Sequence, residues 1–216
     1  YSFRCIPQVH GASLDAIHYV EQIAEREINA VTDNPLLIDH QRILSGGNFH
    51  AQPLALASDF LSIALAELGN IAERRLYQLV GGLRGLPDFL TEDAGLRSGY
   101  MIVQYAAAAL VSLNKQYASP SSVDSIISSK GQEDHVSMAA NAGIKCRKIV
   151  EQTQQIVAME WMTAHRAWHF RSQWKLSASL DHIYQRYEHL HTFKQEDHIP
   201  SEDYSVAVDF LRSIHD

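Results

Sequence analysis

The feature that most constrains the fold is the run from Asp134 to about Arg171, which holds no proline and only one glycine. As a single helix it would extend ~55 Å, at ~1.5 Å per residue. A helix of that length exceeds the usual ~10–14 residues and needs many neighbours to bury its several faces. We therefore expect a multi-helix or intersubunit bundle, and with it an oligomer.

Hydrophobic periodicity predicts further helices along the chain. Leu14, Ile17 and Val20 recur at three- and four-residue steps, which is typical of one face of a helix. Similar patterns and breaker residues place the other elements. The predicted helices cover residues 11–31, 53–79 and 99–117, the long run from 134, and two shorter segments near 177–190 and 201–214.

Two local features complete the predicted fold. Residues 36–45 are short, partly β-branched and followed by Gly46 and Gly47, so we expect at most a small hairpin or an extended loop there. Ser201, followed by the acidic Glu202 and Asp203, is a reasonable N-terminal cap for the last helix. The sequence predicts a mainly α protein.

Composition narrows the function classes. The formal net charge is −7 and basic residues are scattered, which disfavours nucleic acid or an anionic membrane as a partner. The two cysteines, Cys5 and Cys146, lack metal-type spacing, so a reducing, cytoplasmic location is expected. Charged residues interrupt the apolar runs before the ~18 residues of a membrane span, and no signal segment opens the chain. Because the chain begins at Tyr1 without a methionine, we also expect a fragment.

Each candidate site residue could also have a purely structural role. Glu133 precedes the predicted long helix, where the positive end of the helix dipole favours a carboxylate for structural reasons alone. Asn48 and Phe49 follow two glycines and could simply form a turn into a helix. Arg4 could be a surface charge or a fork for a substrate carboxylate.

Other chemistries find little support. His165 and His169 are spaced as a zinc-binding helix pair could be, but no acidic third ligand lies in a convincing frame, so no metal is expected. The chain has no Gly-x-Ser-x-Gly elbow, and neither cysteine has a local partner that would mark a nucleophile.

Five segments, taken together, carry a more specific signal. They are residues 1–12 (YSFRCIPQVHGA), 29–36 (NAVTDNPL), 45–51 (SGGNFHA), 122–125 (SVDS) and 132–138 (QEDHVSM). In content and order they resemble the aromatic amino acid lyases, and among these the pattern is most similar to histidine ammonia-lyases. The resemblance runs over essentially all 216 residues.

The resemblance implies a long-helix bundle of the fumarase and aspartase type. It implies a homotetramer whose sites combine residues of several subunits. The family uses methylideneimidazolone, an electrophile formed from an internal Ala-Ser-Gly tripeptide. This chain contains no Ala-Ser-Gly, since Ala12 and Ser13 are followed by Leu14. We therefore expect residues 1–216 to be the C-terminal part of a lyase, with central bundle and C-terminal helices, inactive without the N-terminal half.

The resemblance also assigns roles to particular residues. Arg4 would bind the substrate carboxylate, and Tyr1 would lie beside the electrophile and the substrate amino group as a proton relay. Phe49 would pack near the prosthetic ring, and Asn48 would help to orient that wall. Glu133 would hydrogen-bond an imidazole N–H or act as base toward the β-proton. Gln132 and Met101 would contact the substrate.

These roles imply elimination of ammonia from L-histidine to give trans-urocanate. In the phenylalanine lyases the position that matches Glu133 is glutamine, and the plant-type enzymes have lysine at the position of Met101. Some bacterial tyrosine ammonia-lyases resemble the 132–135 pattern too, so tyrosine is the alternative substrate. A non-catalytic scaffold remnant is the alternative of another class, and it is disfavoured because unpaired buried Arg or Glu would be costly.

Overall fold

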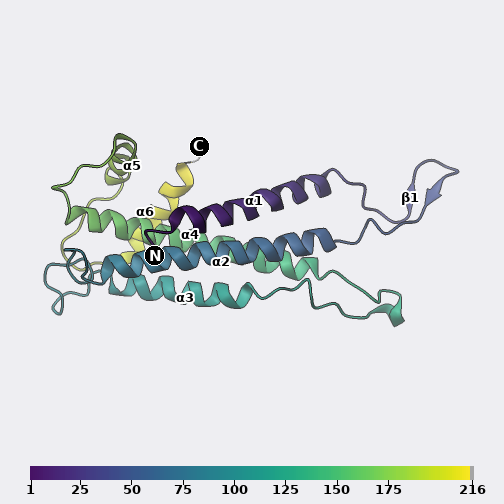
Figure 1. The fold of residues 1–216 in the computed structure, drawn as a ribbon, viewed down its shortest axis with the longest axis horizontal. Helices are drawn as coiled ribbons and strands as arrows, with labels where there is room; N and C mark the ends of the chain where they lie inside the picture. The colour runs from purple at the N-terminus through teal and green to yellow at the C-terminus, as the bar shows by residue number, and fades with distance from the viewer. Residues whose placement is uncertain (215–216) are drawn as a thin grey trace. The chain divides into compact units, whose positions relative to one another are not determined.

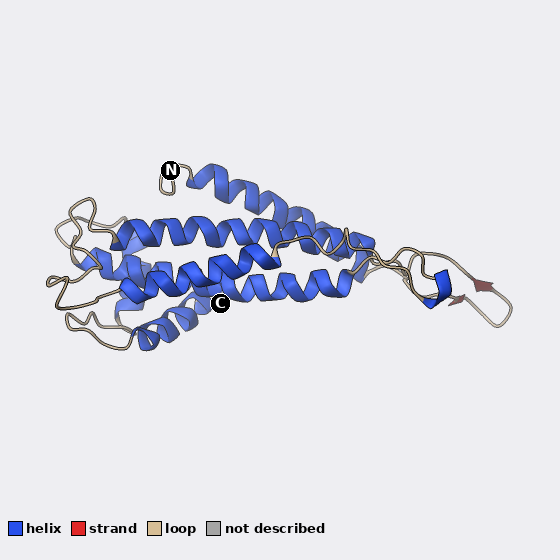
Figure 2. Ribbon diagram, turned by 90° about the horizontal axis from the view of Figure 1, so that it is seen from below, coloured by secondary structure: helices blue, strands red, loops and turns tan. Residues whose placement is uncertain are grey.

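The computed structural model describes residues 1–214 and is mainly helical (Figure 1). The predicted helices and the small hairpin are confirmed, with differences at some boundaries. The helices are α1 (Ile6–Ile28), α2 (Gln52–Val80), α3 (Met101–Tyr117), α4 (Ala139–His169), α5 (Ala178–Glu188) and α6 (Pro200–Ser213), with a 3₁₀ turn, η1, at Ser129–Gly131. Strands β1 (Leu36–Leu37) and β2 (Ile43–Leu44) pair antiparallel, Leu36 opposite Leu44 (Figure 2).

Proline marks the start of three of these helices. Pro7, Pro53 and Pro200 each lie in a first turn, where the missing N–H costs no helical hydrogen bond and the fixed φ suits a helix. The predicted Ser201 cap is wrong for this reason. Pro200 already occupies the first turn, Ile199 is the N-cap, and Ser201 lies inside α6.

The start of α4 also differs from the prediction. The helix begins at Ala139, five residues after the expected Asp134. Met138 has φ of 56°, in the left-handed region that a right-handed helix does not use. At 31 residues, α4 is still the longest helix in the described part of the chain, ~46 Å at ~1.5 Å per residue.

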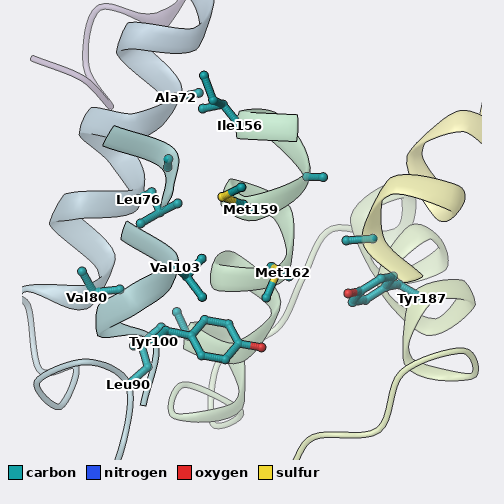
Figure 3. Packing of buried hydrophobic residues seen from close by; sticks show 14 of the residues in the cluster. Ala72, Leu76, Val80, Leu90, Tyr100, Val103, Ile156, Met159, Met162 and Tyr187 are labelled. Carbon is teal, nitrogen blue, oxygen red and sulfur yellow. The ribbon is translucent and has the colours of Figure 1, made fainter. Parts of the chain in front are cut away.

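The chain divides into two compact units. Unit 1 comprises residues 1–5, 69–113 and 151–216, and unit 2 comprises residues 6–68 and 114–150. The core of unit 1 is formed by apolar side chains of α2, α3 and α4 together with Tyr187 of α5 (Figure 3). Phe210 of α6 belongs to the same core. Both of those aromatic residues are at most 2% exposed, so α5 and α6 are anchored to this core.

Unit 2 is packed through small side chains. Ala16 of α1, Ala55 and Ala57 of α2, and Ala142 of α4 are all buried, and small residues let helix backbones approach closely. Ser13 Oγ donates to the Ala64 carbonyl at 3.3 Å, which joins α1 to α2. Larger apolar side chains of the same helices are exposed instead. They include Leu14, Tyr19, Leu56, Phe60, Ile63 and Ile144.

One helix of the described residues, α2, is long and apolar enough to cross a membrane by length and composition alone. A core helix of a globular protein passes the same test. Glu73 and Arg75 of α2 are both buried, and Arg75 forms an ion pair with Glu160 of α4. These contacts fit a core helix better than a lipid-facing one.

Candidate functional site

The predicted site residues fall in two groups, one in each unit. Tyr1, Arg4 and Met101 belong to unit 1. The second group belongs to unit 2 and consists of Asn48, Phe49, Gln132 and Glu133. Each group is built by a different set of contacts.

In unit 2, the loop before α2 is fixed to the segment after α1. Asn34 Oδ1 accepts hydrogen bonds from Ser45 Oγ and from the Gly46 amide, both at 3.1 Å. Asn48 Nδ2 donates to the Val31 carbonyl at 2.7 Å. The Asn48 side chain therefore holds the loop that carries Phe49, while the Phe49 side chain itself is 54% exposed.

The same loop meets the segment that carries Glu133. His50 Nε2 lies 3.1 Å from the His135 carbonyl oxygen, and the two imidazole rings are stacked with centroids 5.6 Å apart and planes within 3°. Phe49 and Glu133 thus each lie within two residues of one contact. The structure therefore brings segments 45–51 and 132–138 together through His50 and His135.

Segment 122–125 is hydrogen-bonded to residues of the same region. The Val136 amide donates to Ser125 Oγ at 2.9 Å, and the Ser122 amide donates to the buried carboxylate of Asp59 at 2.7 Å. Gln52 Nε2 reaches the Ser122 carbonyl at 3.5 Å. All four unit 2 segments singled out in the sequence are therefore connected by hydrogen bonds at one end of the unit.

Glu133 is not a helix cap. It lies six residues before Ala139, beyond the first turn of α4 where the helix dipole acts. Its carbonyl accepts the Ser128 amide at 3.0 Å across the turn at Ser129–Gly131, where all three residues have positive φ. The Glu133 side chain is exposed, and its one recorded contact within the described residues is Ser128 Oγ at 3.4 Å. The backbone is held and the carboxylate is left accessible.

In unit 1, the first residues leave two polar side chains accessible. The Cys5 amide donates to the Tyr1 carbonyl at 2.8 Å, and the Tyr1 side chain is 94% exposed. Arg4 is exposed, and its side chain has no recorded ion pair or hydrogen bond within residues 1–214. Met101 is half-buried as the first residue of α3.

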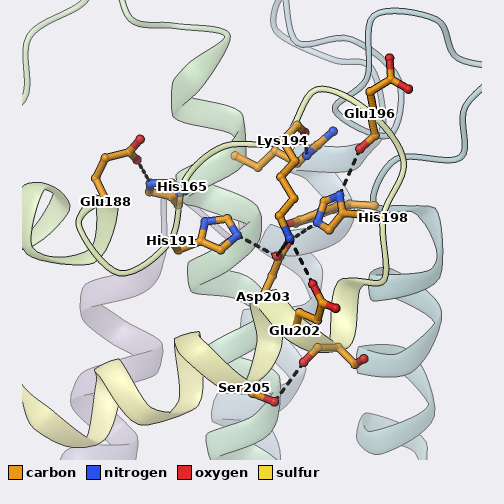
Figure 4. Close-up of polar contacts among 12 residues, drawn as sticks. His165, Glu188, His191, Lys194, Glu196, His198, Glu202, Asp203 and Ser205 are labelled. Carbon is orange, nitrogen blue, oxygen red and sulfur yellow. Dashed lines mark hydrogen bonds and ion pairs between the residues drawn. The ribbon is translucent and has the colours of Figure 1, made fainter.

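A second polar cluster, in unit 1, was not predicted (Figure 4). Asp203 of α6 is 1% exposed, and its carboxylate contacts four side chains, one of them Lys194, whose Nζ lies 3.9 Å from Asp203 Oδ1. Tyr100 Oη donates to its carboxylate at 2.6 Å, His198 Nε2 contacts the same oxygen, and His191 Nε2 lies 2.8 Å from the other. The sequence offered only a capping role for Asp203, because its partner Tyr100 lies about a hundred residues away in the chain.

The histidines of α4 have structural partners. His165 is paired with Glu188 and stacks on Tyr184 with centroids 4.9 Å apart, and burial lowers its pKa. His169 stacks on Phe193. Among residues 1–214 no cluster of His, Cys, Asp and Glu could hold a metal ion.

Comparison with known proteins identifies relatives of this chain. The family described as aromatic amino acid lyase matches residues 1–189. The chain is 49% identical to histidine ammonia-lyase of Caldanaerobacter subterraneus over 99% of its length, which is 42% of that protein. It therefore spans less than half the length of this curated relative.

Solved structures agree. The histidine ammonia-lyase of Trypanosoma cruzi superposes with a TM-score of 0.94 at 40% identity, covering 99% of this chain and 43% of that one. A tyrosine aminomutase of Streptomyces globisporus superposes with a TM-score of 0.92 at 34% identity, covering 100% of this chain and 43% of that one. The chain belongs to the aromatic amino acid lyase family.

Proposed function

We propose that this chain supplies the C-terminal portion of a histidine ammonia-lyase, which eliminates ammonia from L-histidine to give trans-urocanate. The observation that carries the proposal is the state of Glu133. It is an accessible carboxylate outside any helix, on a backbone fixed by the Ser128 amide and by the contacts of His135. Similarity to histidine ammonia-lyases over nearly the whole chain supports the same substrate.

Glu133 suits an imidazole substrate for a chemical reason. A carboxylate accepts a hydrogen bond from the ring N–H and stabilises the charged ring. An apolar ring offers the carboxylate neither an N–H donor nor a positive charge. The same carboxylate could act as base toward the weakly acidic β-proton. Gln132 and Met101 would complete the contacts around the ring.

Arg4 and Tyr1 would act on the other end of the substrate. The guanidinium of Arg4 has no partner within the described residues, so its paired N–H donors are free to bind the α-carboxylate in a bidentate manner. The exposed phenol of Tyr1 would hold or relay a proton at the amino group. Phe49, positioned through Asn48, would form an apolar wall.

The family's methylideneimidazolone would supply the electrophile. Residues 1–216 contain no Ala-Ser-Gly from which it could form. The aromatic side chains proposed to face it, Tyr1 and Phe49, are exposed on this chain, which fits a group supplied by other sequence. No other cofactor and no metal is required.

The proposed assembly is a cytoplasmic homotetramer with sites shared between subunits. Large apolar side chains exposed on the unit 2 helices support a partner surface, because soluble monomers seldom expose many such residues together. The proposed partners are the amino acid substrate, further copies of the chain and the N-terminal half of the enzyme. Neither nucleic acid nor a membrane is among them.

The test uses the full-length protein with L-histidine and L-tyrosine in parallel. We expect ultraviolet absorbance of urocanate from histidine and none of coumarate from tyrosine. The opposite result would establish tyrosine lyase, the second candidate, which similarity to a tyrosine aminomutase favours. Intact-mass measurement of the natural protein tests the remnant alternative. A species of only this chain's 24.3 kDa, with no co-purifying N-terminal piece, would support a non-catalytic scaffold.

A further inference from the structure

The start of α3 is held by a segment far away in sequence. Residues 190–199, here named the C-terminal strap, join α5 to α6 and lie beyond residue 189, where the family match ends. Asp197 of the strap accepts the Ser98 amide at 2.8 Å and the Gly99 amide at 3.0 Å, one on each carboxylate oxygen. These two amide hydrogen bonds hold the pKa of Asp197 below its usual value.

The next residue, Tyr100, is held equally firmly. It is 1% exposed, and its hydroxyl donates to Asp203 of α6 at 2.6 Å. The guanidinium of Arg166 lies 4.7 Å from the centre of the Tyr100 ring. Arg166 also donates to the carbonyl of Lys194, a strap residue, at 2.8 Å. A cation over an aromatic ring, fixed by a further hydrogen bond, restrains the ring in one position.

The backbone of this turn also packs closely against Phe89. Gly99 has φ of 51°, and a Cβ placed there would lie 2.3 Å from the Phe89 carbonyl oxygen. The Tyr100 amide donates to the same carbonyl at 2.9 Å. Residues 98–100 are thus held by contacts with Phe89, with the strap and with α6. Met101 follows immediately as the first residue of α3.

We propose that the C-terminal strap, through Asp197, and α6, through Asp203, act as positioning elements that set the place of Met101 in the substrate site. The proposal rests on the role of Met101 in the proposed function. A displacement of ~1 Å at a substrate-contacting residue can cost a large factor in rate. Asp197 and Asp203 would then influence substrate preference without touching the substrate.

The kinetic test is a double-mutant cycle in the full-length enzyme with Asp197→Ala and Met101→Ala. We expect Asp197→Ala to lower kcat/KM for L-histidine about fivefold or more, mainly through KM. In the Met101→Ala background the same change should have little further effect, because the residue that it positions is gone. Additive effects of the two substitutions would overturn the proposal.

The matched control is Glu196→Gln, the neighbouring strap carboxylate. Glu196 pairs with the Arg97 side chain at 2.9 Å and contacts neither amide of the turn. It should leave kcat/KM within about twofold of the parent value, as expected for an exposed ion pair. An equal loss in Glu196→Gln and Asp197→Ala would show a general effect of strap charge and overturn the proposal.

A second measurement is independent of activity. Amide hydrogen exchange should be faster at residues 98–103 in Asp197→Ala and in the milder Asp197→Asn, but unchanged in Glu196→Gln. Unchanged exchange in the Asp197 variants would also overturn the proposal. If the enzyme turns over tyrosine instead of histidine, the substrate assignment is wrong. The double-mutant cycle is then run with tyrosine and still decides whether Asp197 acts through Met101.

Discussion

At the scale of single residues, Glu133 is a position where the sequence allowed two interpretations and the structure excludes one of them. Its position before a proline-free run favoured a helix-capping carboxylate over a substrate contact. The structure removes the first interpretation, because Ala139 starts the helix six residues later. The chemical role proposed for Glu133 rests on the resemblance, which also singles out Arg4 and Phe49; hydrophobic periodicity reveals none of these residues.

We expect Glu133→Gln to lower kcat for L-histidine by about 10²–10⁴-fold, the usual contribution of a general base. Its melting temperature should stay close to the parent value, because the side chain is exposed and has one weak contact, with Ser128. The matched control is Asp134→Asn, an exposed neutralisation next in sequence. Retained histidine turnover in Glu133→Gln would leave the carboxylate with a local structural role.

Arg4→Lys should raise KM for L-histidine about tenfold with a smaller change in kcat. Lysine keeps the charge but presents no planar pair of donors to a carboxylate. Because Arg4 is exposed and unpaired within the described residues, thermal stability should not change. Steady-state kinetics on the purified full-length variant decide the matter, and an unaltered KM would exclude the carboxylate-binding role.

At the scale of elements, the helices and most of their starts were predictable, whereas the starts of α1 and α4 each differ from the prediction by five residues. The cores of α2 and α3 follow from regular apolar spacing, and α2 ends at Val80, one residue after the predicted end and just before Gly81 and Gly82. The start of α4 could not be predicted, because residues 134–138 contain no breaker. Backbone groups of this segment instead form hydrogen bonds with residues outside it. The Val136 amide, for example, donates to Ser125 Oγ. Tertiary hydrogen bonds there outweigh local helix propensity.

The contacts of the Asp203 carboxylate predict that the stability of the protein depends on pH. Burial alone would raise the pKa of Asp203, but its contacts with His191, Tyr100 and His198 outweigh burial and hold the pKa well below the ordinary value of 3.8. A carboxyl group with a depressed folded-state pKa stabilises the fold above its unfolded pKa and loses that contribution as pH falls further.

We therefore expect Asp203→Asn to destabilise the protein by ~1–3 kcal/mol at neutral pH, with the difference from the parent shrinking below about pH 4. Melting temperatures measured across this range provide the test. Asp209→Asn, an exposed change on the same helix, should have little effect at any pH. A pH-independent difference between Asp203→Asn and the parent would mean that the Asp203 charge does not stabilise the fold.

At the scale of the whole molecule, the 216-residue chain should fold but remain inactive by itself. The core of unit 1 is continuous through five helices, from Ala72 of α2 to Phe210 of α6, which favours folding without further sequence. Activity is another matter. Tyr1 and Phe49 expose most of their side chains, and no Ala-Ser-Gly is present to provide the electrophile.

The purified chain should therefore show a helical circular dichroism spectrum and a cooperative melt, yet release no urocanate from L-histidine. The exposed apolar side chains of unit 2, such as Leu56 and Phe60, should make it self-associate in size-exclusion chromatography. Double substitution of these two by Gln should reduce the self-association and leave the helical content unchanged, because neither side chain is buried. Urocanate release by the isolated chain would show that its residues do not depend on an electrophile from other sequence, and would overturn the proposed division of the site.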